Sequence, residues 1–595
     1  MAEKIGSELS ALPSFEPTLD QMQQWTRSIG QAQQMLLEHA AGQMAKAEKS
    51  AGIAPAQTAF ALPFNPDLLT QVQADFAKES MALWQRFLDA DPANNAAPAS
   101  SRAARKDRRF ADPKWAEHPF FDMIKQSYLV LSDYLLRLSD TVDGIDQHQK
   151  GQMRFAVQGL VDAMAPSNFA ITNPVVMEKT IETGGDNLVR GLRHMLADMD
   201  KGQLTHTDGS VFEVGVNIAA TPGKVIHETP LYQLIHYQPT TEKVRKTPLI
   251  VFPPWINRFY ILDLAPHKSF VKWAVDQGIS LFMVSWKSAD ASMKDVEWAD
   301  YIVRGQIDAI DTVRELLGVE NVHTIGYCVA GTTLATTLAY LTARGEADKV
   351  KSATFFTAQV DFSEAGDLSL FVDDEQLKLV DQLAAPGYLD GRYMAATFNL
   401  LRGRDLIWNY VVNNYLLGAD YPPFDLLFWN GDTTNLPAKW HRQYLTDLYR
   451  DNKLAIPGAI SIEGTPIDLR LVKTPSYIQA GKEDHIAPPE SVWKMTQHFT
   501  GAMRFTLAGS GHIAGVVNPP SSGKYQYWTC EEPNVASLNA FVEQSHETAG
   551  SWWPDWLQWL GTLDSETVPA TKARIPGKGK LKAIEDAPGR YVKNR

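Results

Sequence analysis

The chain has 595 residues, a formal net charge of −13 and two cysteines, Cys328 and Cys530. This length exceeds what one hydrophobic core usually supports, so we expect two or more folding units. The negative charge disfavours a nucleic-acid partner, and the scarcity of cysteines excludes a disulfide framework and clustered zinc ligands.

No segment suggests secretion or membrane insertion. The stretch MAEKIGSELSALPSFEP lacks the apolar run of a signal peptide, and nowhere do about 18 uncharged apolar residues follow one another. The sequence has neither a glycine-rich phosphate loop nor metal-ligand spacing, so we predict no cofactor and no metal. We therefore expect a soluble cytoplasmic protein that is not an integral membrane protein.

The N-terminal part is predicted to be helical in two blocks. Residues 17–50 and the later stretch LLTQVQADFAKESMALWQRFLDA are rich in helix formers, with apolar residues near helical spacing. Residues 91–105, DPANNAAPASSRAAR, have the composition of a linker, and a second helical block follows it. We therefore predict a variable helical region with a linker over residues 1–105 and a separate helical N-terminal domain over residues 106–210.

The pattern changes near residue 210, where short apolar, β-rich runs begin to precede polar or Gly/Pro turns. Because these runs alternate with helical stretches, they predict an α/β domain over residues 211–566 with a mostly parallel sheet. Ligands bind such sheets beyond the carboxyl ends of the strands. The runs are TPLIVFPPWIN (247–257), SLFMVSWK (280–287), NVHTIGYC (321–328), KSATFFTAQVDF (351–362), TPSYIQAGKEDH (474–485) and MRFTLAGSGH (503–512).

Residues 321–345 predict a strand, a sharp turn and a helix, with Cys328 in the turn. Small residues at Gly326 and Ala330 match a nucleophile elbow, in which the turn crowds the backbone; Gly326 and Gly331 relieve that crowding. The start of a helix at this point favours the thiolate form of Cys328. A buried and inert cysteine is the alternative interpretation.

A nucleophile elbow also needs amide donors for the developing oxyanion. The N–H of Val329 is placed as one donor. We expect the second from the turn after LIVFPPWIN, from the amide near Trp255 or Ile256. Asn257 in the same turn either holds a polar group of the substrate or a water, or only shapes the turn.

Residues 363–449 interrupt the alternation with a long, aromatic and mostly helical segment. Because this insertion falls between two core strands, beyond their carboxyl ends, we predict a cap that keeps water from the site. Arg402 and Arg404 either meet phosphate groups of a substrate or remain solvated at the surface. Six aromatic residues either line a lid or product channel or pack within the cap itself: Trp408, Tyr410, Tyr415, Phe428, Trp429 and Trp440.

In elbow enzymes the acid and then the histidine follow the nucleophile along the chain, each after a strand. SYIQAGKEDHIAPP offers Asp484, and FTLAGSGHIAGVVNPP offers His512. Their order and strand context predict a catalytic triad of Cys328, His512 and Asp484. His485 is the competing base, and Glu483 is the competing acid.

Two C-terminal features have alternative interpretations. Residues 551–561, SWWPDWLQWLG, either anchor the protein to a hydrophobic surface or a partner subunit, or pack a terminal helix onto the core. Residues 567–595 form a basic tail interrupted by prolines. We expect this tail to be a solvated, weakly ordered terminus rather than a surface for an anionic partner.

Five segments, in order, resemble signature segments of class I polyhydroxyalkanoate (poly-3-hydroxybutyrate) synthases: PPWINRFYILDL, GYCVAGTTL, FDLLFWNGDTTNLP, GKEDHIAP and GSGHIAGVVNPP. The resemblance covers about residues 107–560. It implies an α/β-hydrolase fold in which Cys328, His512 and Asp484 match the nucleophile, the general base and the acid. The elbow departs from the usual Gly-x-Cys-x-Gly-Gly, because Ala330 replaces the first of the paired glycines.

The resemblance implies an acyltransferase that polymerises (R)-3-hydroxyacyl groups from coenzyme A thioesters. Its implied partners are the (R)-3-hydroxyacyl-CoA, the growing polyester chain, a second copy of the chain in a homodimer, and the surface of a polymer granule in the cytoplasm. A Cys-dependent thioesterase or hydrolase on the same fold is the first alternative. A noncatalytic granule-surface protein that keeps the fold is the second.

Overall fold

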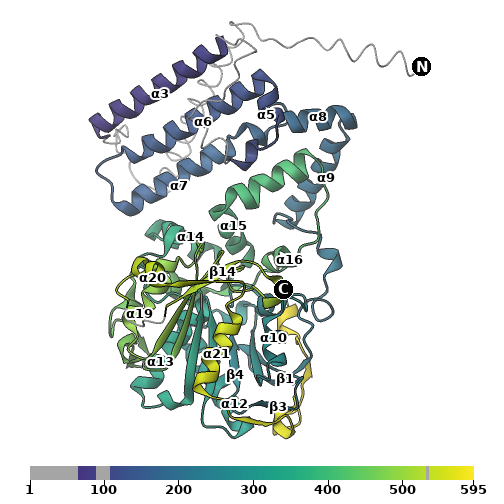
Figure 1. Ribbon diagram of the computed structural model, residues 1–595, viewed down its shortest axis with the longest axis vertical. Helices are drawn as coiled ribbons and strands as arrows, with labels where there is room; N and C mark the ends of the chain where they lie inside the picture. The colour runs from purple at the N-terminus through teal and green to yellow at the C-terminus, as the bar shows by residue number, and fades with distance from the viewer. Residues whose placement is uncertain (1–63, 89–106, 531–534, 595) are drawn as a thin grey trace, which may run out of the picture. The chain divides into compact units, whose positions relative to one another are not determined.

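The computed structural model describes residues 64–88, 107–530 and 535–594 (Figure 1). Residues 65–595 belong to one compact unit, and the fold below is that of this unit. The helix predicted within residues 17–50 and the linker predicted over residues 91–105 lie outside the described residues.

A sheet of eleven strands forms the centre of the described residues, in the order β15-β14-β13-β12-β7-β6-β4-β5-β2-β1-β17. Its parallel strands are β4 (Leu249–Phe252), β5 (Leu281–Trp286), β6 (Val322–Tyr327), β7 (Val350–Phe356), β12 (Ser476–Gly481) and β13 (Met503–Ala508). Each of the six apolar runs singled out in the sequence is one of these strands. The predicted α/β class with a mostly parallel sheet is therefore confirmed.

Antiparallel strands extend the sheet at both edges, and the sequence reading did not single them out. On one edge lie β2 (Tyr232–Tyr237), β1 (Gly223–Glu228) and β17 (Glu585–Asp586). On the other edge lie β14 (Gln526–Thr529) and β15 (His546–Ala549). Shorter two-stranded pairs are β3 (Lys243–Arg245) with β16 (Thr567–Pro569), β8 (Tyr388–Leu389) with β9 (Leu436–Pro437), and β10 (Ser461–Ile462) with β11 (Thr465–Pro466).

Helices cover both faces of the sheet (Figure 1). One hydrophobic core joins the sheet to α12 (Asp308–Leu317) and α13 (Val329–Ala343), and the other joins it to α10 (Phe270–Asp276) and α21 (Trp553–Leu563). Near the β12–β13 edge lie α18 (Pro489–Trp493), α19 (Met495–His498) and α20 (Leu538–Gln544).

The tryptophan-rich segment at residues 551–561 packs into the second of these cores. Trp552, Trp553 and Trp556 are fully buried, and Trp553 lies against Phe270 of α10 with ring centroids 5.1 Å apart. The indole N–H of Trp552 donates to the carbonyl of Gly515, and that of Trp553 donates to Val516. Of the two interpretations of this segment, the structure shows the packing of a terminal helix.

The insertion between β7 and β12 forms the predicted helical cap. Its helices are α14 (Asp374–Leu383), α15 (Gly391–Leu401), α16 (Asp425–Gly431) and α17 (Ala438–Gln443), with the more irregular helical segments η9 (Gly366–Phe371), η10 (Arg404–Trp408), η11 (Val411–Leu416) and η12 (Tyr444–Arg450). Trp440 stacks on Tyr444 with ring centroids 5.1 Å apart, so α17 and η12 share a packed aromatic face.

Residues before the sheet are helical, as predicted: α3 (Pro66–Leu88), α5 (Lys114–Glu117), α6 (Pro119–Asp140), α7 (Gln147–Ala163), α8 (Pro174–Thr183) and α9 (Asp186–Lys201). Figure 1 shows α3, α6 and α7 side by side, and a small core with Trp115 and Tyr128 joins this region. Among the described residues, none of the helices combines the length and the apolar character that crossing a membrane requires.

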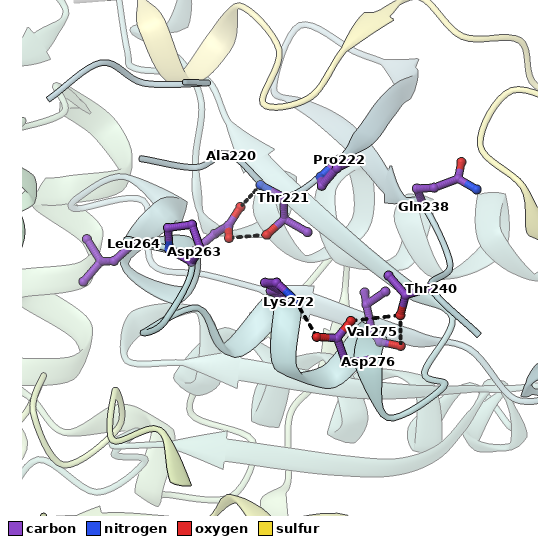
Figure 2. Close-up of a pocket in the computed structure, with 11 residues that line it drawn as sticks. Ala220, Thr221, Pro222, Gln238, Thr240, Asp263, Leu264, Lys272, Val275 and Asp276 are labelled. Carbon is purple, nitrogen blue, oxygen red and sulfur yellow. Dashed lines mark hydrogen bonds and ion pairs between the residues drawn. The ribbon is translucent and has the colours of Figure 1, made fainter. Parts of the chain in front are cut away.

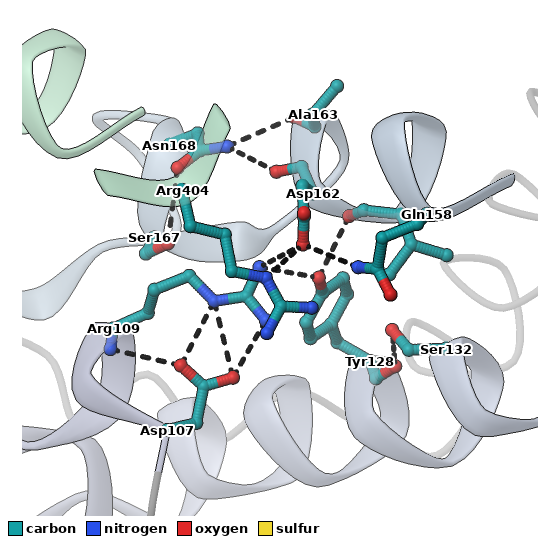
Figure 3. A network of polar contacts seen from close by, with 11 residues as sticks. Asp107, Arg109, Tyr128, Ser132, Gln158, Asp162, Ala163, Ser167, Asn168 and Arg404 are labelled. Carbon is teal, nitrogen blue, oxygen red and sulfur yellow. Dashed lines mark hydrogen bonds and ion pairs between the residues drawn. The ribbon is translucent and has the colours of Figure 1, made fainter. Parts of the chain in front are cut away.

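A charged network ties these N-terminal helices to the cap (Figure 3). Asp162 of α7 accepts hydrogen bonds from Nη1 of Arg109 at 3.2 Å and from Nε of Arg404 in η10 at 2.6 Å. Arg109 also pairs with Asp107 at 2.7 Å and donates to the hydroxyl of Tyr128 at 2.9 Å. The carboxylate of Asp162 therefore joins two segments that lie far apart in the sequence.

The expectation of a weakly ordered basic tail at residues 567–595 is wrong for the described part. β16 pairs with β3, and β17 extends the central sheet beside β1. Tyr591 and Val592 are buried, and Arg590 forms ion pairs with Glu228 and Glu585. Arg574 donates to the carbonyls of Arg245 and Lys246, so strand pairing, burial and these polar contacts hold the segment on the core.

Candidate active site

Cys328 lies in the sharp turn between β6 and α13. Its backbone has φ 53° and ψ −126°, a left-handed conformation that a non-glycine residue rarely adopts. The N–H of Cys328 donates to the carbonyl of Phe356 at 2.9 Å, and its carbonyl accepts from the N–H of Gly331 at 2.8 Å. These bonds hold the strained turn, and Cys328 is only partly buried.

The two glycines of the elbow permit a close approach of the strand and the helix. A Cβ on Gly326 would lie 2.6 Å from Cα of Gly331, and a Cβ on Gly331 would lie 2.4 Å from Cβ of Ala358. Ala330 needs no such space: its side chain belongs to the hydrophobic core, and its carbonyl accepts from Nε2 of Gln306 at 2.9 Å. The alanine that replaces the family's glycine at position 330 therefore lies on the core side of the turn.

His512 and Asp484 follow β13 and β12, as predicted, and meet beside Cys328. Nδ1 of His512 lies 2.7 Å from Oδ2 of Asp484, whose side chain is fully buried. Oδ1 of Asp484 accepts from the N–H groups of Ile486 and Ala487 at 2.8 and 2.9 Å. Both carboxylate oxygens are thus occupied, and one of them orients the imidazole.

The electrostatics of His512 reflect these neighbours. Burial alone would lower the pKa of His512, but Asp484, the sulfur of Cys328 and hydrogen bonds to both outweigh it and raise the pKa to about 10. The Cys328 thiol lies within hydrogen-bonding reach of the imidazole. Asp484 holds the imidazole in place beside the thiol, as a base that takes the thiol proton requires.

The competing candidates are placed less favourably. Glu483 is exposed to solvent, whereas Asp484 is buried on the imidazole. His485 is half-buried, and desolvation lowers its pKa. Nδ1 of His485 is buried and has no hydrogen-bond partner among the residues that the structure describes, whereas Nδ1 of His512 is paired with Asp484.

A cavity of about 320 Å³ opens onto Cys328 and extends into the cap. Val329, Thr332, Thr357 and Gln359 line it from the core, and the cap contributes a mainly aliphatic wall from α14, α15, α17 and η12. The hydroxyl of Thr357 is buried and has no hydrogen-bond partner within the described part of the chain. The lining of the cavity is thus mainly apolar, as in many binding sites for small molecules.

The predicted oxyanion donors differ in their access to this cavity. Val329 is the first residue of α13, so its N–H has no acceptor within the helix. Val329 and Ile256 both line the cavity beside Cys328. Trp255 instead stacks on Tyr301 with ring centroids 4.0 Å apart, and its carbonyl accepts from the hydroxyl of Thr434.

Asn257 lies in the same turn but is held by its own surroundings. Its Oδ1 accepts from the N–H of Arg258 at 2.8 Å, and its backbone forms an antiparallel bridge to Thr433 of the cap. This geometry matches the turn-shaping alternative. Contact with a substrate stays a prediction.

The two arginines predicted to meet phosphate groups pair with acids of the protein, and none of the six predicted aromatic residues lines the cavity at Cys328. Arg402 pairs with Asp405 at 2.5 Å, and Arg404 pairs with Asp162. Different aromatic residues, Tyr444 and Tyr449, line the cavity near the nucleophile. Burial is the main cause that raises the pKa of Tyr449, and the charge of nearby Cys328 is the next. Tyr444 and Tyr449 are five residues apart, so α-helical spacing in the sequence did not place them on one face.

A second cavity, of about 170 Å³, lies near α10 and holds none of the predicted site residues (Figure 2). Its polar groups pair with one another: Asp263 accepts from the hydroxyl of Thr221 at 2.6 Å, and Lys272 pairs with Asp276 at 2.6 Å. These polar groups of the second cavity already pair with one another, and none of the predicted site residues lies there. We therefore take the cavity at Cys328 as the candidate active site.

Comparisons with known proteins identify the family of the chain. The family described as "Poly-beta-hydroxybutyrate polymerase (PhaC) N-terminus" matches residues 106–274, and "alpha/beta hydrolase fold" matches residues 252–519. A "Poly(3-hydroxyalkanoate) polymerase subunit PhaC" from Rhizobium meliloti (strain 1021) is 44% identical, over 89% of this chain and 86% of the relative. The chain belongs to the poly(3-hydroxyalkanoate) polymerase family.

Other members of the family are similarly close. The "Poly(3-hydroxyalkanoate) polymerase" of Methylorubrum extorquens is 43% identical over 89% of this chain and 87% of its own length. The "Poly(3-hydroxyalkanoate) polymerase subunit PhaC" of Cupriavidus necator is 41% identical over 89% of each chain. The resemblance to polyhydroxyalkanoate synthases and the α/β-hydrolase fold are confirmed, and the protein is an enzyme, an acyltransferase of this poly(3-hydroxyalkanoate) polymerase family.

Proposed function

We propose that the protein polymerises (R)-3-hydroxyacyl groups from coenzyme A thioesters through an acyl enzyme on Cys328. The observation that carries the proposal is the meeting of Cys328, His512 and Asp484 at the mouth of one apolar cavity. The relatives' names support polymerisation as the overall reaction.

Acylation starts when His512 takes the proton of the Cys328 thiol. The thiolate attacks the thioester carbonyl, and the N–H groups of Val329 and Ile256 stabilise the oxyanion. The carbon–sulfur bond to coenzyme A then breaks, and the leaving thiolate takes the proton back from His512. Because one thioester replaces another, the acyl group keeps its activation.

Elongation needs a hydroxyl nucleophile. The 3-hydroxyl of an acyl unit gives its proton to His512 and attacks the acyl carbonyl on Cys328, so an ester bond forms and the carbon–sulfur bond breaks. The sulfur recovers the proton from His512. Asp484 keeps the imidazole oriented and balances its charge in both steps.

Product analysis tests this proposal against a thioesterase. The protein is incubated with (R)-3-hydroxybutyryl-CoA, and coenzyme A, free acid and insoluble polyester are measured together. We expect coenzyme A release to be matched by polymer. Release matched by free acid alone would assign the site to hydrolysis, and absence of any release would favour the noncatalytic alternative.

We further propose that α9 contacts the surface of the polyester granule. This helix directs Asn187 and Asp198 inward and exposes Val189, Leu196 and Met199, which are 49%, 50% and 69% accessible. An apolar polymer would cover these side chains. Replacing Leu196 by Glu should reduce sedimentation with polyester particles without lowering coenzyme A release from dissolved substrate. Unchanged sedimentation would contradict this proposal.

A homodimer and a cytoplasmic location stay predictions.

A further inference from the structure

His441 is a polar side chain in the otherwise mainly aliphatic cap wall of the cavity. It lies on α17, is 3% accessible, and lines the same cavity as Cys328. The cavity lining also includes Leu383, Leu389 and Leu445. Nδ1 of His441 is buried without a hydrogen-bond partner among the described residues.

An unpaired buried nitrogen is unfavourable, because it has lost its hydrogen bond to water without gaining another. Because His441 lines the cavity, a ligand there is the partner that we consider for this nitrogen. Burial lowers the pKa of His441 to about 4, so the ring is neutral near pH 7. A neutral imidazole in an apolar wall suits an uncharged oxygen better than a phosphate or a carboxylate.

The position of His441 indicates which oxygen it meets. His441 precedes Tyr444 by three residues along the continuous helical stretch α17–η12, so the two side chains are about 5–6 Å apart on one face. Cys328 lies close enough to contribute to the raised pKa of Tyr444, after burial and Tyr449, whereas burial is the cause for His441. Both side chains line the cavity that opens onto Cys328.

We propose that His441 donates a hydrogen bond from Nδ1 to an ester carbonyl of the growing polyester, beyond the unit attached to Cys328. This inference rests on the proposed function and names a subsite for the chain within it. A poly-3-hydroxyacyl chain carries one ester carbonyl per repeat, and one repeat has a length of the same order as the Tyr444–His441 separation. His441 thus binds substrate and positions the chain, without taking part in proton transfer.

The test compares two probes on the full-length protein. One is the coenzyme A thioester of a linear 3-hydroxybutyrate trimer, which carries ester carbonyls. The other is a straight-chain acyl-CoA of matched length without them. Transfer of each acyl group to Cys328 is followed by intact-protein mass spectrometry, and the ratio of the two acylation rates is the readout.

We expect His441→Phe to lower the trimer-to-alkyl rate ratio about 2- to 10-fold, the loss of one hydrogen bond. His441→Gln, whose amide still donates, should keep most of the ratio. His441→Leu replaces His441→Phe if thermal unfolding shows that the larger ring is not tolerated. Because the ratio is internal to each variant, a general loss of packing moves both rates and leaves it unchanged.

Equal trimer-to-alkyl rate ratios in wild type and in the folded apolar variant would overturn the subsite. The same result would be found if only a water pairs with Nδ1 of His441. An absence of adducts from both probes on wild type would instead overturn the proposed function, and the subsite with it. The two failures are therefore distinguishable in one experiment.

Discussion

Nδ1 of His512 lies 2.7 Å from Oδ2 of Asp484, and the second oxygen of that carboxylate is held by the N–H groups of Ile486 and Ala487. The direction of the imidazole is thus fixed by the backbone of the loop after β12. A fixed imidazole removes one source of reorganisation from both proton transfers in the proposed reaction.

The nucleophile is tested most directly by Cys328→Ala. We expect no adduct with an acyl-CoA and a loss of coenzyme A release of roughly 10³-fold or more, because the acyl enzyme cannot form. The melting temperature serves as the folding control. Cys530, the second free cysteine, gives the matched variant: Cys530→Ala should keep the adduct. Equal labelling of both variants would contradict the assignment.

His512→Ala should slow both acylation and elongation by about 10²- to 10⁴-fold, the usual contribution of a positioned base. Rapid-quench measurement of the first coenzyme A released separates acylation from later turnovers. His485→Ala is the matched control, because Nδ1 of His485 lacks the carboxylate contact that His512 has. A larger loss in His485→Ala would reverse the choice of base.

The raised pKa of His512 makes stability depend on pH. The folded-state pKa of about 10 lies above the ordinary value of 6.5, so this stabilisation is fully present below about pH 6.5 and is lost as the pH rises through 10. Asp484→Asn removes the principal charge that raises this pKa. We expect its melting temperature to fall furthest below wild type near pH 6 and least near pH 10. A constant difference across this range would show that the pair does not titrate in this way.

Gly331→Ala should destabilise the elbow by about 1–3 kcal/mol, because its methyl group would meet Ala358 and the carbonyl of Gly326. Ala330→Gly at the adjacent position should cost only about 0.5–1 kcal/mol, the lower helix propensity of glycine. Denaturant unfolding measures both. Coenzyme A release should be nearly unchanged in Ala330→Gly, since Ala330 packs in the core.

Asp162→Ala should loosen the junction between α7 and the cap. It leaves Arg109 and Arg404 without a shared acceptor, and we expect a loss of about 1–3 kcal/mol. Arg402→Ala is the control, because Arg402 pairs with Asp405 at an exposed site and should cost about 1 kcal/mol or less. Thermal unfolding compares the stability of the two variants. Equal losses of stability would mean that the junction at Asp162 does not stabilise the protein.

The sequence predicted the parallel strands because each is a short apolar run before a turn. It did not predict β2, whose residues are all buried without alternation, or β17, whose two residues are acidic and form a strand only beside β1. Pairing partners of edge strands are distant in sequence, so local pattern does not specify them.

The predicted triad residues were found because order and strand context are local properties. The cavity wall was harder, since which face of each cap helix turns inward depends on tertiary packing. Trp440 was proposed for the lining, yet it packs fully buried on Tyr444, and His441 beside it faces the cavity instead. Neighbouring residues on a helix point in different directions. An error of one position in the sequence therefore assigns a core residue to the cavity wall, or a wall residue to the core.

The cavity at Cys328 has a volume of about 320 Å³, whereas a polyester has no upper limit of length. Under the proposed reaction the enclosed space holds only the newest units, and it cannot act as a ruler for the product. The molar mass of the polymer would then be set kinetically, by the competition between the next addition and the release of the chain.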